Sequence, residues 1–436
     1  MAKSTSIFFC SQCGNEFAKW SGQCPACHEW NTLTEAEPFM RTPKKGSKTS
    51  KRIKPVEALT VKEALSEPKH NFSTGIGELD RVLGPGLTQG GAYLLAGQPG
   101  IGKSTLLTQV CLVSERPVFY VCSEENPAQV ATRIQRLTAK KSPDTLHLLN
   151  SSSVEEIAAN IAKNPRSLFV VDSIQSVYSE NNLTTPGSPS QVRDSASILI
   201  TAAKDHAVSL IIVGHVTKEG SIAGPKMLEH MVDVVLELTG DRQYMLRLLR
   251  SIKNRFGPTD ETGIFSMDSS GLQEVLDPSQ ILLAGRLENV PGSALTMIME
   301  GTRPLTVEIQ ALIVPSQIPV PRRIAKGISI NRLQLICAVL IKHLRLPLGE
   351  KDVFVNVTGG IDIKDPGADL GIALAILSSV KNISLPKKSV CFGELGLLGE
   401  IRRVAMSEKM SKEARKLGYT KMFSPETYHT LKSITL

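Results

Sequence analysis

The chain has 436 residues, more than one hydrophobic core usually serves, so we expect two or three domains. Its 41% hydrophobic and 21% charged content is ordinary for a globular protein, and no stretch approaches the roughly 18 apolar residues that a membrane span needs. The first residues contain no apolar signal-peptide region, so we expect a cytoplasmic protein with no membrane partner. The net charge of +8 and the isoelectric point near 9.0 favour a polyanionic partner without identifying one.

Four of the eight cysteines form two Cys-x-x-Cys pairs near the start of the chain. The pairs are Cys10 with Cys13 and Cys24 with Cys27. Each pair can turn two sulfurs toward one ion, and two pairs complete the tetrahedral shell of Zn²⁺. A redox dithiol is the alternative, but redox pairs come singly on an α/β scaffold. We therefore predict a four-cysteine zinc ribbon over residues 1–33, and its role in binding DNA, binding protein or folding stays open.

Residues 34–70 are predicted to be a basic, flexible linker. Between residues 41 and 54 there are seven lysines or arginines and no acid, among Ser, Thr, Pro and Gly neighbours. A solvated tether is the favoured interpretation, and an arm that touches nucleic-acid phosphates is the alternative.

From residue 71 to residue 280, short apolar runs alternate with amphipathic stretches, the pattern of a parallel sheet covered by helices. The runs are continuously apolar, which is typical of strands buried on both faces. We expect strands at 93–96, 117–121, 167–171 and 209–213, and helices at 104–113, 154–163 and 191–206.

A phosphate-binding pattern follows the first of these strands and opens the first helix. Its residues are Gly97, Gln98, Pro99, Gly100, Ile101, Gly102, Lys103 and Ser104, with Thr105 next to them. Glycines allow backbone N–H groups to wrap phosphates, and a helix N-terminus favours negative charge. We expect Lys103 to reach the β- and γ-phosphates of ATP, and Ser104 to ligate Mg²⁺.

Three acids lie at the ends of two of the expected strands. Asp172 ends the run 168–171, where a carboxylate can hold the metal or its water, although alone it could be a helix cap. Glu124 and Glu125 follow the strand 117–121, where an acid can orient the attacking water. We favour Glu124 as this base and keep Glu125 as its substitute; the alternative is that these are surface acids starting a helix at Pro127.

A basic element follows the expected strand 244–252. It consists of Lys253, Asn254, Arg255, Phe256 and Gly257. Lys253 and Arg255 are two apart, so extended backbone would aim both toward one side. They could reach a neighbouring subunit's γ-phosphate or a DNA phosphate, and two solvated cations on a loop are the alternative.

His215 and Lys218 follow the strand 209–213 and form a second candidate element. In RecA-like folds, which the phosphate loop and the strand pattern resemble, a polar group there can sense the γ-phosphate and pass its state to a loop such as the Gly-rich stretch 220–225. The alternative for His215 is a hydrogen-bonded core histidine.

Residues 281–436 are expected to form a separate α+β domain. It should contain a strand at 306–314 and helices at 331–344, 368–380 and 407–417, with a Pro-rich loop at 315–321.

Taken together, these elements resemble the RadA (Sms) family of bacterial DNA-repair proteins. The resemblance is carried by the four-cysteine ribbon, the phosphate loop and the segments 72–84, 124–125, 214–220 and 253–257, and it covers nearly the whole chain. It implies a RecA-like core related to hexameric replicative helicases, with ATP at the subunit interfaces of a homohexameric ring. It also implies binding of single-stranded and branched DNA, branch migration or other processing of recombination intermediates, and recombinase or helicase partners.

The C-terminal segment resembles the proteolytic domain of Lon over 352–357, 359–360 and 364–371. In this resemblance Ala368 occupies the place of the catalytic serine, and the place of the lysine falls near Ser407, with Lys409 two residues away. Alanine offers no nucleophilic oxygen, so the resemblance implies a proteolytically inactive domain used for oligomerisation or as a DNA surface. The cations available for such a surface are Arg322, Arg323, Lys326, Arg402 and Arg403, and a solvated side chain with no contact is the favoured interpretation of each.

Two other functions compete with a DNA-stimulated ATPase. A RecA-like regulatory ATPase of the circadian-clock type also carries paired glutamates after a strand, but the ribbon and the Lon-like domain argue against it. An active ATP-dependent protease is opposed by Ala368.

Overall fold

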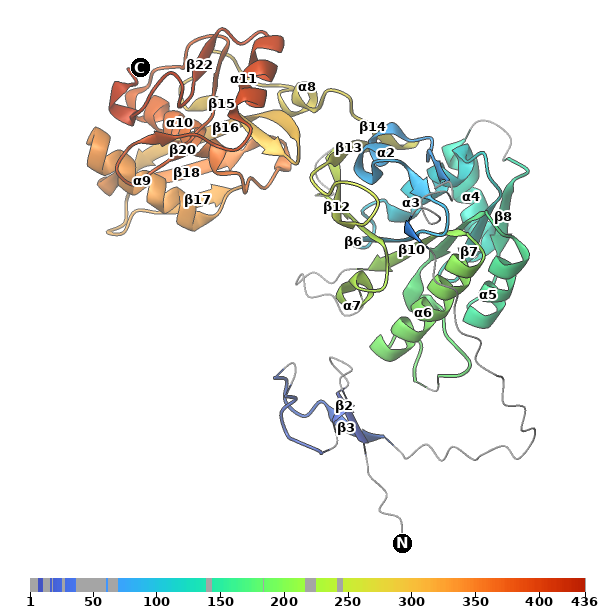
Figure 1. Ribbon diagram of the computed structural model, residues 1–436. Coiled ribbons are helices and arrows are strands. Elements are labelled where there is room, and N and C mark those ends of the chain that lie inside the picture. Colours follow the sequence, from blue (N-terminus) through green and yellow to red (C-terminus); the bar gives the residue numbers. More distant parts are fainter. Residues whose placement is uncertain are drawn as a thin grey trace, which may run out of the picture. The chain divides into compact units, whose positions relative to one another are not determined.

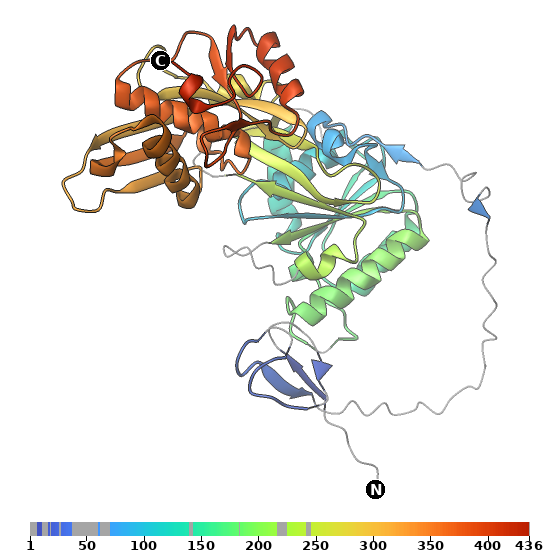
Figure 2. The ribbon, with the colours of Figure 1, turned by 60° about the vertical axis from the view of Figure 1, so that its left-hand side comes forward.

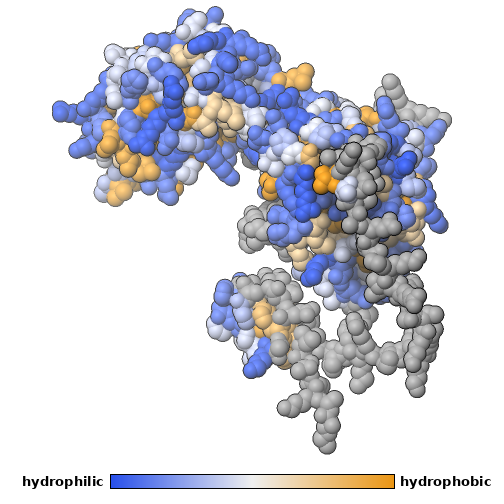
Figure 3. Space-filling model, in the orientation of Figure 1, coloured by the Kyte–Doolittle hydropathy of each residue, from blue (hydrophilic) through white to orange (hydrophobic). Residues whose placement is uncertain are grey.

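The structure, a computed structural model, describes residues 7–10, 16–17, 19–25, 28–36, 60–61, 70–138, 143–182, 184–215, 225–240 and 246–435. They fall into two compact units (Figure 1). The first consists of Met1–Ile76, Leu83–Glu237 and Ile252–Gly257, and the second of Gly77–Val82, Leu238–Ser251 and Pro258–Leu436. On the face drawn in Figure 3, hydrophilic residues cover most of the surface and apolar residues are exposed in small patches. None of the described helices has the length and apolar character needed to cross a bilayer.

The N-terminal part of the first unit is a small antiparallel sheet in the order β2-β1-β3. Its strands are β1 (Ile7–Cys10), β2 (Glu16–Phe17) and β3 (Leu33–Ala36). Cys10, Cys24 and Leu33 are buried together, with Phe17 packed against them. A core of so few side chains cannot stabilise a fold by apolar burial alone, which favours a structural metal.

The main part of the first unit is a parallel sheet whose strands are formed by the continuously apolar runs of the sequence. The parallel strands are β6 (Ala92–Gly97), β7 (Val118–Cys122), β8 (Leu146–Leu149), β9 (Leu168–Asp172) and β10 (Ser209–His215). They lie in the order β6-β10-β9-β7-β8, and β11 (Val234–Thr239) lies on the other side of β6. Every residue of β6, β7 and β9 is buried, as expected for strands covered on both faces. The four strands predicted in this region are confirmed.

Helices cover both faces of this sheet. They are α3 (Lys103–Val113), α4 (Pro127–Leu137), α5 (Val154–Lys163), α6 (Pro189–Asp205) and the short α7 (Pro225–Glu229), and the three predicted helices are confirmed to within two residues. The long helix α6, green in Figure 2, packs with α5 against Phe119 and Val121 of β7. Tyr120 lies between these two residues in the strand and therefore points to the opposite face, where α4 meets it.

Two short elements precede the sheet and one follows β9. The segment 72–84 begins within β4 (Asn71–Phe72), which pairs with β5 (Leu87–Thr88). A short 3-10 turn, η1 (Ile174–Ser176), follows β9.

The second unit begins with antiparallel strands that are tied to a short helix. These elements are α2 (Gly77–Leu83), β12 (Leu246–Asn254), β13 (Thr262–Asp268), β14 (Gly271–Glu274) and α8 (Pro278–Leu282). The carboxylate of Glu78 is buried and accepts a hydrogen bond of 2.9 Å from the backbone N–H of Ile264 and an ion pair of 2.8 Å from Arg303. Since Ile264 lies in β13 and Arg303 is the first residue of β16 (Arg303–Pro315), one buried carboxylate fixes α2 to both strands.

The rest of the second unit is built on a six-stranded sheet in the order β17-β18-β16-β15-β19-β22 (Figure 1). The strands are β15 (Ser293–Glu300), β16 (Arg303–Pro315), β17 (Arg323–Lys326), β18 (Lys351–Val357), β19 (Ser389–Cys391) and β22 (Lys421–Phe423). The helices are α9 (Ile330–Leu344), α10 (Asp369–Lys381) and α11 (Ser407–Lys416). The remaining elements are β20 (Glu394–Leu395), β21 (Ile401–Arg402), η2 (Leu348–Glu350), η3 (Thr358–Gly360), η4 (Pro366–Ala368) and η5 (Leu431–Ser433).

Helix α10 is the centre of this core. Its first ten residues are all buried. Gly371 allows it to approach β15 closely, because a Cβ at this position would lie 2.6 Å from the Cβ of Thr296. The predicted strand at 306–314 and the three predicted helices are confirmed, and this part of the unit is α+β as expected.

Candidate nucleotide-binding site

The phosphate loop connects the carboxyl end of β6 to the start of α3. Gly100 and Gly102 have φ angles of 72° and 120°, which favour glycine, and they turn the backbone into the helix. Gly102, the residue that precedes α3, has no side chain that could cap the first turn of the helix. The loop therefore has the form that holds phosphate oxygens.

Lys103, the first residue of α3, is 4% exposed. Its ammonium donates hydrogen bonds of 2.8 Å to the carbonyl of Gly97 and 3.0 Å to that of Gln98, which holds it against the loop. Burial lowers the pKa of Lys103 from its ordinary value to about 8, and the negative charges of Asp172 and Glu124 oppose that shift. A buried cation whose charge interacts with two carboxylates is suited to a polyanionic ligand.

Asp172 ends β9 beside the end of β7, where it is paired in parallel register with Cys122. The side chain is 6% exposed, and its Oδ2 accepts a hydrogen bond of 2.5 Å from the hydroxyl of Tyr120. Burial, followed by the charge of Asp172, raises the pKa of Tyr120 well above its ordinary value, so this hydroxyl stays a donor. The strand ends thus place a fixed carboxylate at the edge of the sheet where the phosphate loop begins.

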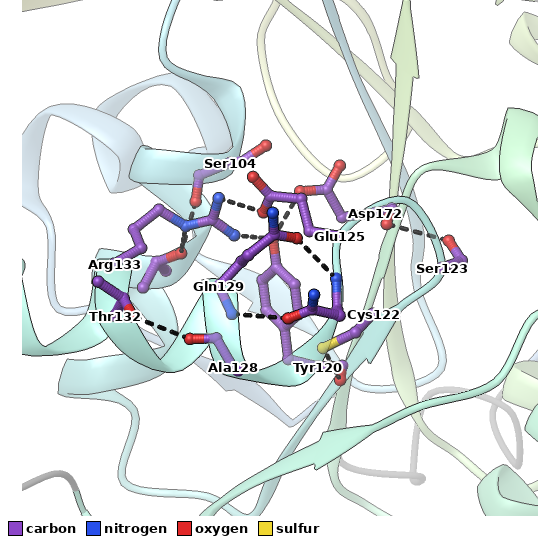
Figure 4. Close-up of polar contacts among 12 residues, drawn as sticks. Ser104, Tyr120, Cys122, Ser123, Glu125, Ala128, Gln129, Thr132, Arg133 and Asp172 are labelled. Carbon is purple, nitrogen blue, oxygen red and sulfur yellow. Dashed lines mark hydrogen bonds and ion pairs between the residues drawn. The ribbon is translucent and has the colours of Figure 1, made fainter.

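Arg133 of α4 connects these groups to one of the two glutamates. Its guanidinium forms an ion pair with Glu125, and donates at 3.1 Å to the hydroxyl of Tyr120 and at 3.1 Å to Oγ1 of Thr108 on α3. Figure 4 shows Glu125, Arg133, Tyr120 and Asp172 joined in one series of contacts. We call these four residues the Arg133 network.

The two adjacent glutamates therefore have different surroundings. Glu125 belongs to the Arg133 network, whereas Glu124 is exposed and its charge acts on Lys103. The α4 helix begins just beyond them with a capping box, in which Asn126 and Gln129 each accept a backbone N–H of the other. The capping box fixes the residue at which α4 begins, directly after the two glutamates. It therefore restricts the backbone at the glutamates and the directions of their side chains.

The element 253–257 is anchored by its own side chains. The ammonium of Lys253 donates to the carbonyls of Glu229 at 2.6 Å and Val232 at 2.8 Å, next to α7. Burial, and then the charge of Arg255, lowers the pKa of Lys253, so the two cations do lie near one another. Asn254 accepts the backbone N–H groups of the next turn, from Phe256 at 2.9 Å and from Gly257 at 3.0 Å.

Arg255 differs from Lys253 in exposure. Its side chain is 55% exposed and pairs at 3.1 Å with Oδ1 of Asp233. Asp233 is buried and its Oδ2 accepts the backbone N–H of Ala92 at 3.1 Å, so the carboxylate joins Arg255 to the start of β6. The ring of Phe256 lies 6.1 Å from that of Tyr93, also in β6. Asp233 is not predictable from the sequence, because its partners are distant along the chain.

Several predicted site residues lie wholly or partly outside the described residues. The backbone of His215 ends β10 and is paired with Gly97 in parallel register, which brings it beside the start of the phosphate loop. Lys218 and the stretch 220–224 lie outside the described residues. Of the four predicted zinc ligands, Cys10 and Cys24 are buried at 1% and 0% exposure, and Cys13 and Cys27 lie outside the described residues.

In the second unit, the position matched to the Lon nucleophile is part of the core. Ala368 ends η4 and is fully buried. The hydroxyl of Ser407 at the start of α11 donates at 2.8 Å to the carbonyl of Val404, and Lys409 is exposed on the same helix. The position matched to the nucleophile therefore carries a buried methyl group and no hydroxyl.

Family models match three separate parts of the chain. The model described as the rubredoxin metal binding domain matches residues 8–35, an AAA domain model matches residues 63–221, and the model for subunit ChlI of Mg-chelatase matches residues 329–428. Among solved structures, a KaiC-like protein from Pyrococcus horikoshii OT3 is 19% identical, covers 48% of this chain and all of its own, and gives a TM-score of 0.39.

Along nearly its full length, the chain is similar to DNA repair proteins of bacteria. The DNA repair protein RadA of Bacillus subtilis strain 168 is 45% identical over 433 residues, covering 98% of this chain and 93% of that protein. The proteins of the same name from Escherichia coli K12 and Pseudomonas aeruginosa are 43% and 42% identical, and each comparison covers 98% of this chain and 94% of the relative.

The fold and the site define a class: a RecA-like P-loop ATPase core, preceded by a zinc-ribbon domain and followed by an α+β domain. At 42–45% identity along nearly its whole length, the chain belongs to the RadA family of DNA repair proteins. The resemblance and the fold class predicted from the sequence are thereby confirmed.

Proposed function

We propose that this chain is a DNA-dependent ATPase of recombinational repair, which binds single-stranded DNA and drives branch migration or other processing of recombination intermediates. One arrangement supports the ATPase part most strongly: Lys103 is buried and donates to the carbonyls of Gly97 and Gln98 in the phosphate loop, and Asp172 ends a neighbouring part of the same sheet. The charges of Asp172 and Glu124 both act on this ammonium. Hydrolysis needs a phosphate anchor, a metal-holding carboxylate and a base within one small volume.

In the proposed reaction the phosphate loop, 97–105, binds the phosphates of ATP. Mg²⁺ would be held by Ser104 and Asp172, and it would neutralise charge on the β- and γ-phosphate oxygens. Lys103 is the fixed cation at the γ-phosphate. Tyr120 donates to one oxygen of Asp172, which leaves the other oxygen for the metal or its water.

Glu124 is the proposed general base. It is exposed at the edge where water can enter, and its charge reaches Lys103, whereas the carboxylate of Glu125 is held by Arg133. A carboxylate next to the γ-phosphate can accept a proton from water as the water attacks, a contribution of about 10²–10⁴ in rate. Glu125 is then a positioning residue that orients α4 and, through Tyr120, Asp172.

Arg255 is proposed to connect ATP hydrolysis in one subunit to the adjacent subunit. Its 55% exposure leaves the guanidinium accessible while Asp233 holds its direction. We propose that it reaches the γ-phosphate of the adjacent subunit in a hexameric ring, with Lys253 and Asn254 fixing the turn that carries it. His215 and Lys218 are proposed to pass the state of the γ-phosphate to the residues that follow them.

The flanking domains are assigned accordingly. Cys10, Cys13, Cys24 and Cys27 are proposed to hold one Zn²⁺, in keeping with the rubredoxin-type match over residues 8–35. The C-terminal domain is proposed to be proteolytically inactive, since Ala368 is buried and has no nucleophilic oxygen, and to serve in oligomerisation. Single-stranded and branched DNA, and recombinase or helicase proteins, are the proposed partners, in the cytoplasm.

The experiment that tests this function measures ATP hydrolysis with and without single-stranded DNA. Stimulation by DNA supports a DNA-dependent motor. A rate that DNA leaves unchanged supports instead the regulatory ATPase considered from the sequence.

A further inference from the structure

Arg133 is a charged residue on the core side of α4. Its neighbours on that side, Val130 and Ile134, are buried, and the side chain of Arg133 itself is only 11% exposed. Taking a guanidinium out of water costs free energy unless it is paired and hydrogen-bonded, and an apolar side chain could fill such a position at lower cost. The burial of this cation therefore indicates that it directs other groups and does not merely fill space.

Each guanidinium nitrogen of Arg133 has its own partner. Nε donates at 3.1 Å to Oγ1 of Thr108 on α3, and Nη2 donates at 3.1 Å to the hydroxyl of Tyr120 in β7. Nη1 is paired with the carboxylate of Glu125, which lies between β7 and α4 (Figure 4). Because the guanidinium is planar and its donors have fixed directions, this one side chain sets the positions of three parts of the ATPase core.

The two hydroxyls that accept from Arg133 both donate to residues of the proposed metal site. Oγ1 of Thr108 donates at 2.6 Å to the carbonyl of Ser104, and the hydroxyl of Tyr120 donates at 2.5 Å to Oδ2 of Asp172. A guanidinium can only donate and a hydroxyl has a single proton, so contact with Arg133 makes each hydroxyl direct its proton toward these acceptors. Arg133 therefore acts on the two residues proposed to hold Mg²⁺, through one intermediate residue in each case.

The charges around Asp172 are arranged in a matching way. The charge of Lys103 interacts with Asp172 and Glu124, and the charge of Arg133 interacts with Glu125 and Asp172. Each cation therefore acts on one of the two glutamates, and both act on Asp172. The carboxylate of Asp172 lies under the influence of a cation next to the phosphate loop and of a cation on α4, so its orientation depends on both.

We propose that Arg133 is a positioning residue for the binding of Mg²⁺ with ATP: it orients the carboxylate of Asp172 through Tyr120 and holds the first turn of α3 through Thr108. This rests on the proposed function in taking Ser104 and Asp172 as the residues that hold Mg²⁺. The partners of Arg133 lie outside the phosphate loop. Its loss should therefore weaken the part of ATP binding that depends on Mg²⁺ and leave the remainder.

Equilibrium binding of a fluorescent, non-hydrolysable ATP analogue tests this role without any hydrolysis. The full chain is titrated with the analogue in Mg²⁺ and again in EDTA, and the ratio of the two affinities is the Mg²⁺-dependent gain. Arg133→Lys keeps the positive charge but cannot direct three nitrogens in one plane. It should reduce the gain at least about fivefold, as expected for loss of one hydrogen bond, and change the affinity in EDTA by less than about twofold.

Two further variants separate positioning from folding. Arg136→Lys makes the same change at an exposed position of α4 and should leave the gain unchanged. In a Tyr120→Phe background, Arg133→Lys should cause a much smaller further loss of the gain, because the connection to Asp172 is already broken. Thermal unfolding of every variant shows that the ATPase core is still folded.

Three results overturn the proposal. An equal gain in Arg133→Lys and in the unchanged protein removes the positioning role. An equal loss of affinity in Mg²⁺ and in EDTA shows that Arg133 only joins α4 to its neighbours. Losses that multiply in the double variant remove Tyr120 as the connection. The proposed function fails on a different result, ATP hydrolysis that DNA does not stimulate, which leaves these binding ratios unaffected, so the two failures are distinguishable.

Discussion

The hydroxyl of Tyr120 donates a hydrogen bond of 2.5 Å to the carboxylate of Asp172, and both side chains are buried. The same hydroxyl accepts a hydrogen bond of 3.1 Å from Arg133. A residue in the middle of the ATPase core thus sets the direction of the carboxylate proposed to hold Mg²⁺. Helix α4 is connected to that carboxylate through a single tyrosine.

Replacing this hydroxyl tests its positioning role. In Tyr120→Phe the ring still fills its place in the core, but Asp172 loses a donor. A buried hydrogen bond to a charged group contributes about 1.5–3 kcal/mol, so we expect the Mg²⁺ concentration for half-maximal ATP hydrolysis to rise about tenfold or more. Hydrolysis rates measured over a range of Mg²⁺ concentrations give this value.

Tyr178→Phe is the matched control, because Tyr178 is a 37% exposed tyrosine of the same unit. It should leave the Mg²⁺ requirement unchanged. If Tyr120→Phe lowered the maximal rate with no shift in the Mg²⁺ requirement, Tyr120 would be a packing residue only.

The two glutamates are expected to respond differently to loss of charge. Glu124→Gln should reduce the rate of hydrolysis about 10²–10⁴-fold while ATP still binds, because the base is lost and the phosphate loop is not. Glu125→Gln breaks the ion pair with Arg133 and should change the rate much less. Single-turnover hydrolysis, together with binding of a fluorescent ATP analogue, distinguishes the two roles. The assignment is reversed if Glu125→Gln is the variant that abolishes hydrolysis.

The buried ammonium of Lys103 predicts a pH dependence of ATP binding. Its pKa is lowered to about 8, so in the nucleotide-free protein the charge is present below pH 8 and is lost as the pH rises through that value. Affinity for ATP should therefore fall above pH 8, by up to about tenfold per pH unit. Equilibrium binding between pH 6.5 and 9.5 measures it, and Lys103→Arg, whose guanidinium keeps its charge, should show no such step. Constant affinity across this range would contradict the lowered pKa.

We expect Lys253 to stabilise the fold and Arg255 to act at a partner. Lys253→Met removes two hydrogen bonds to backbone carbonyls beside α7 and should lower the free energy of unfolding by about 1–2 kcal/mol. Arg255→Ala removes an exposed, solvent-screened ion pair with Asp233 and should change it by less than about 1 kcal/mol. Urea unfolding followed by circular dichroism measures both, and an equal loss in the two variants would contradict the distinction.

Much of the ATPase core could be predicted from the sequence because its strands are short, continuously apolar runs. The apolar runs that end at Gly97 and Asp172 predict strands of the sheet, and their ends predict where the phosphate loop begins and where the carboxylate lies. Cysteine spacing gave the ribbon in the same way, since two Cys-x-x-Cys pairs leave few other uses.

Contacts between residues distant in the chain could not be predicted. Arg133 looks like any cation on an amphipathic helix until α4 packs beside β7 and brings it to Tyr120. Asp233 follows a short helix with no motif around it, and its partners Ala92 and Arg255 are set by strand pairing. Lys253 and Arg255 do lie close together, but the sequence could not show that the Lys253 ammonium is bound to carbonyls beside α7.

The most direct test of the proposed function is the rate of ATP hydrolysis with and without single-stranded DNA, in the unchanged protein, Lys103→Ala and Arg255→Ala. We predict that DNA stimulates the unchanged protein, that Lys103→Ala abolishes hydrolysis, and that Arg255→Ala stays folded but loses the stimulation. An unchanged protein whose rate is the same with and without DNA would contradict the account of this chain as a DNA-dependent motor.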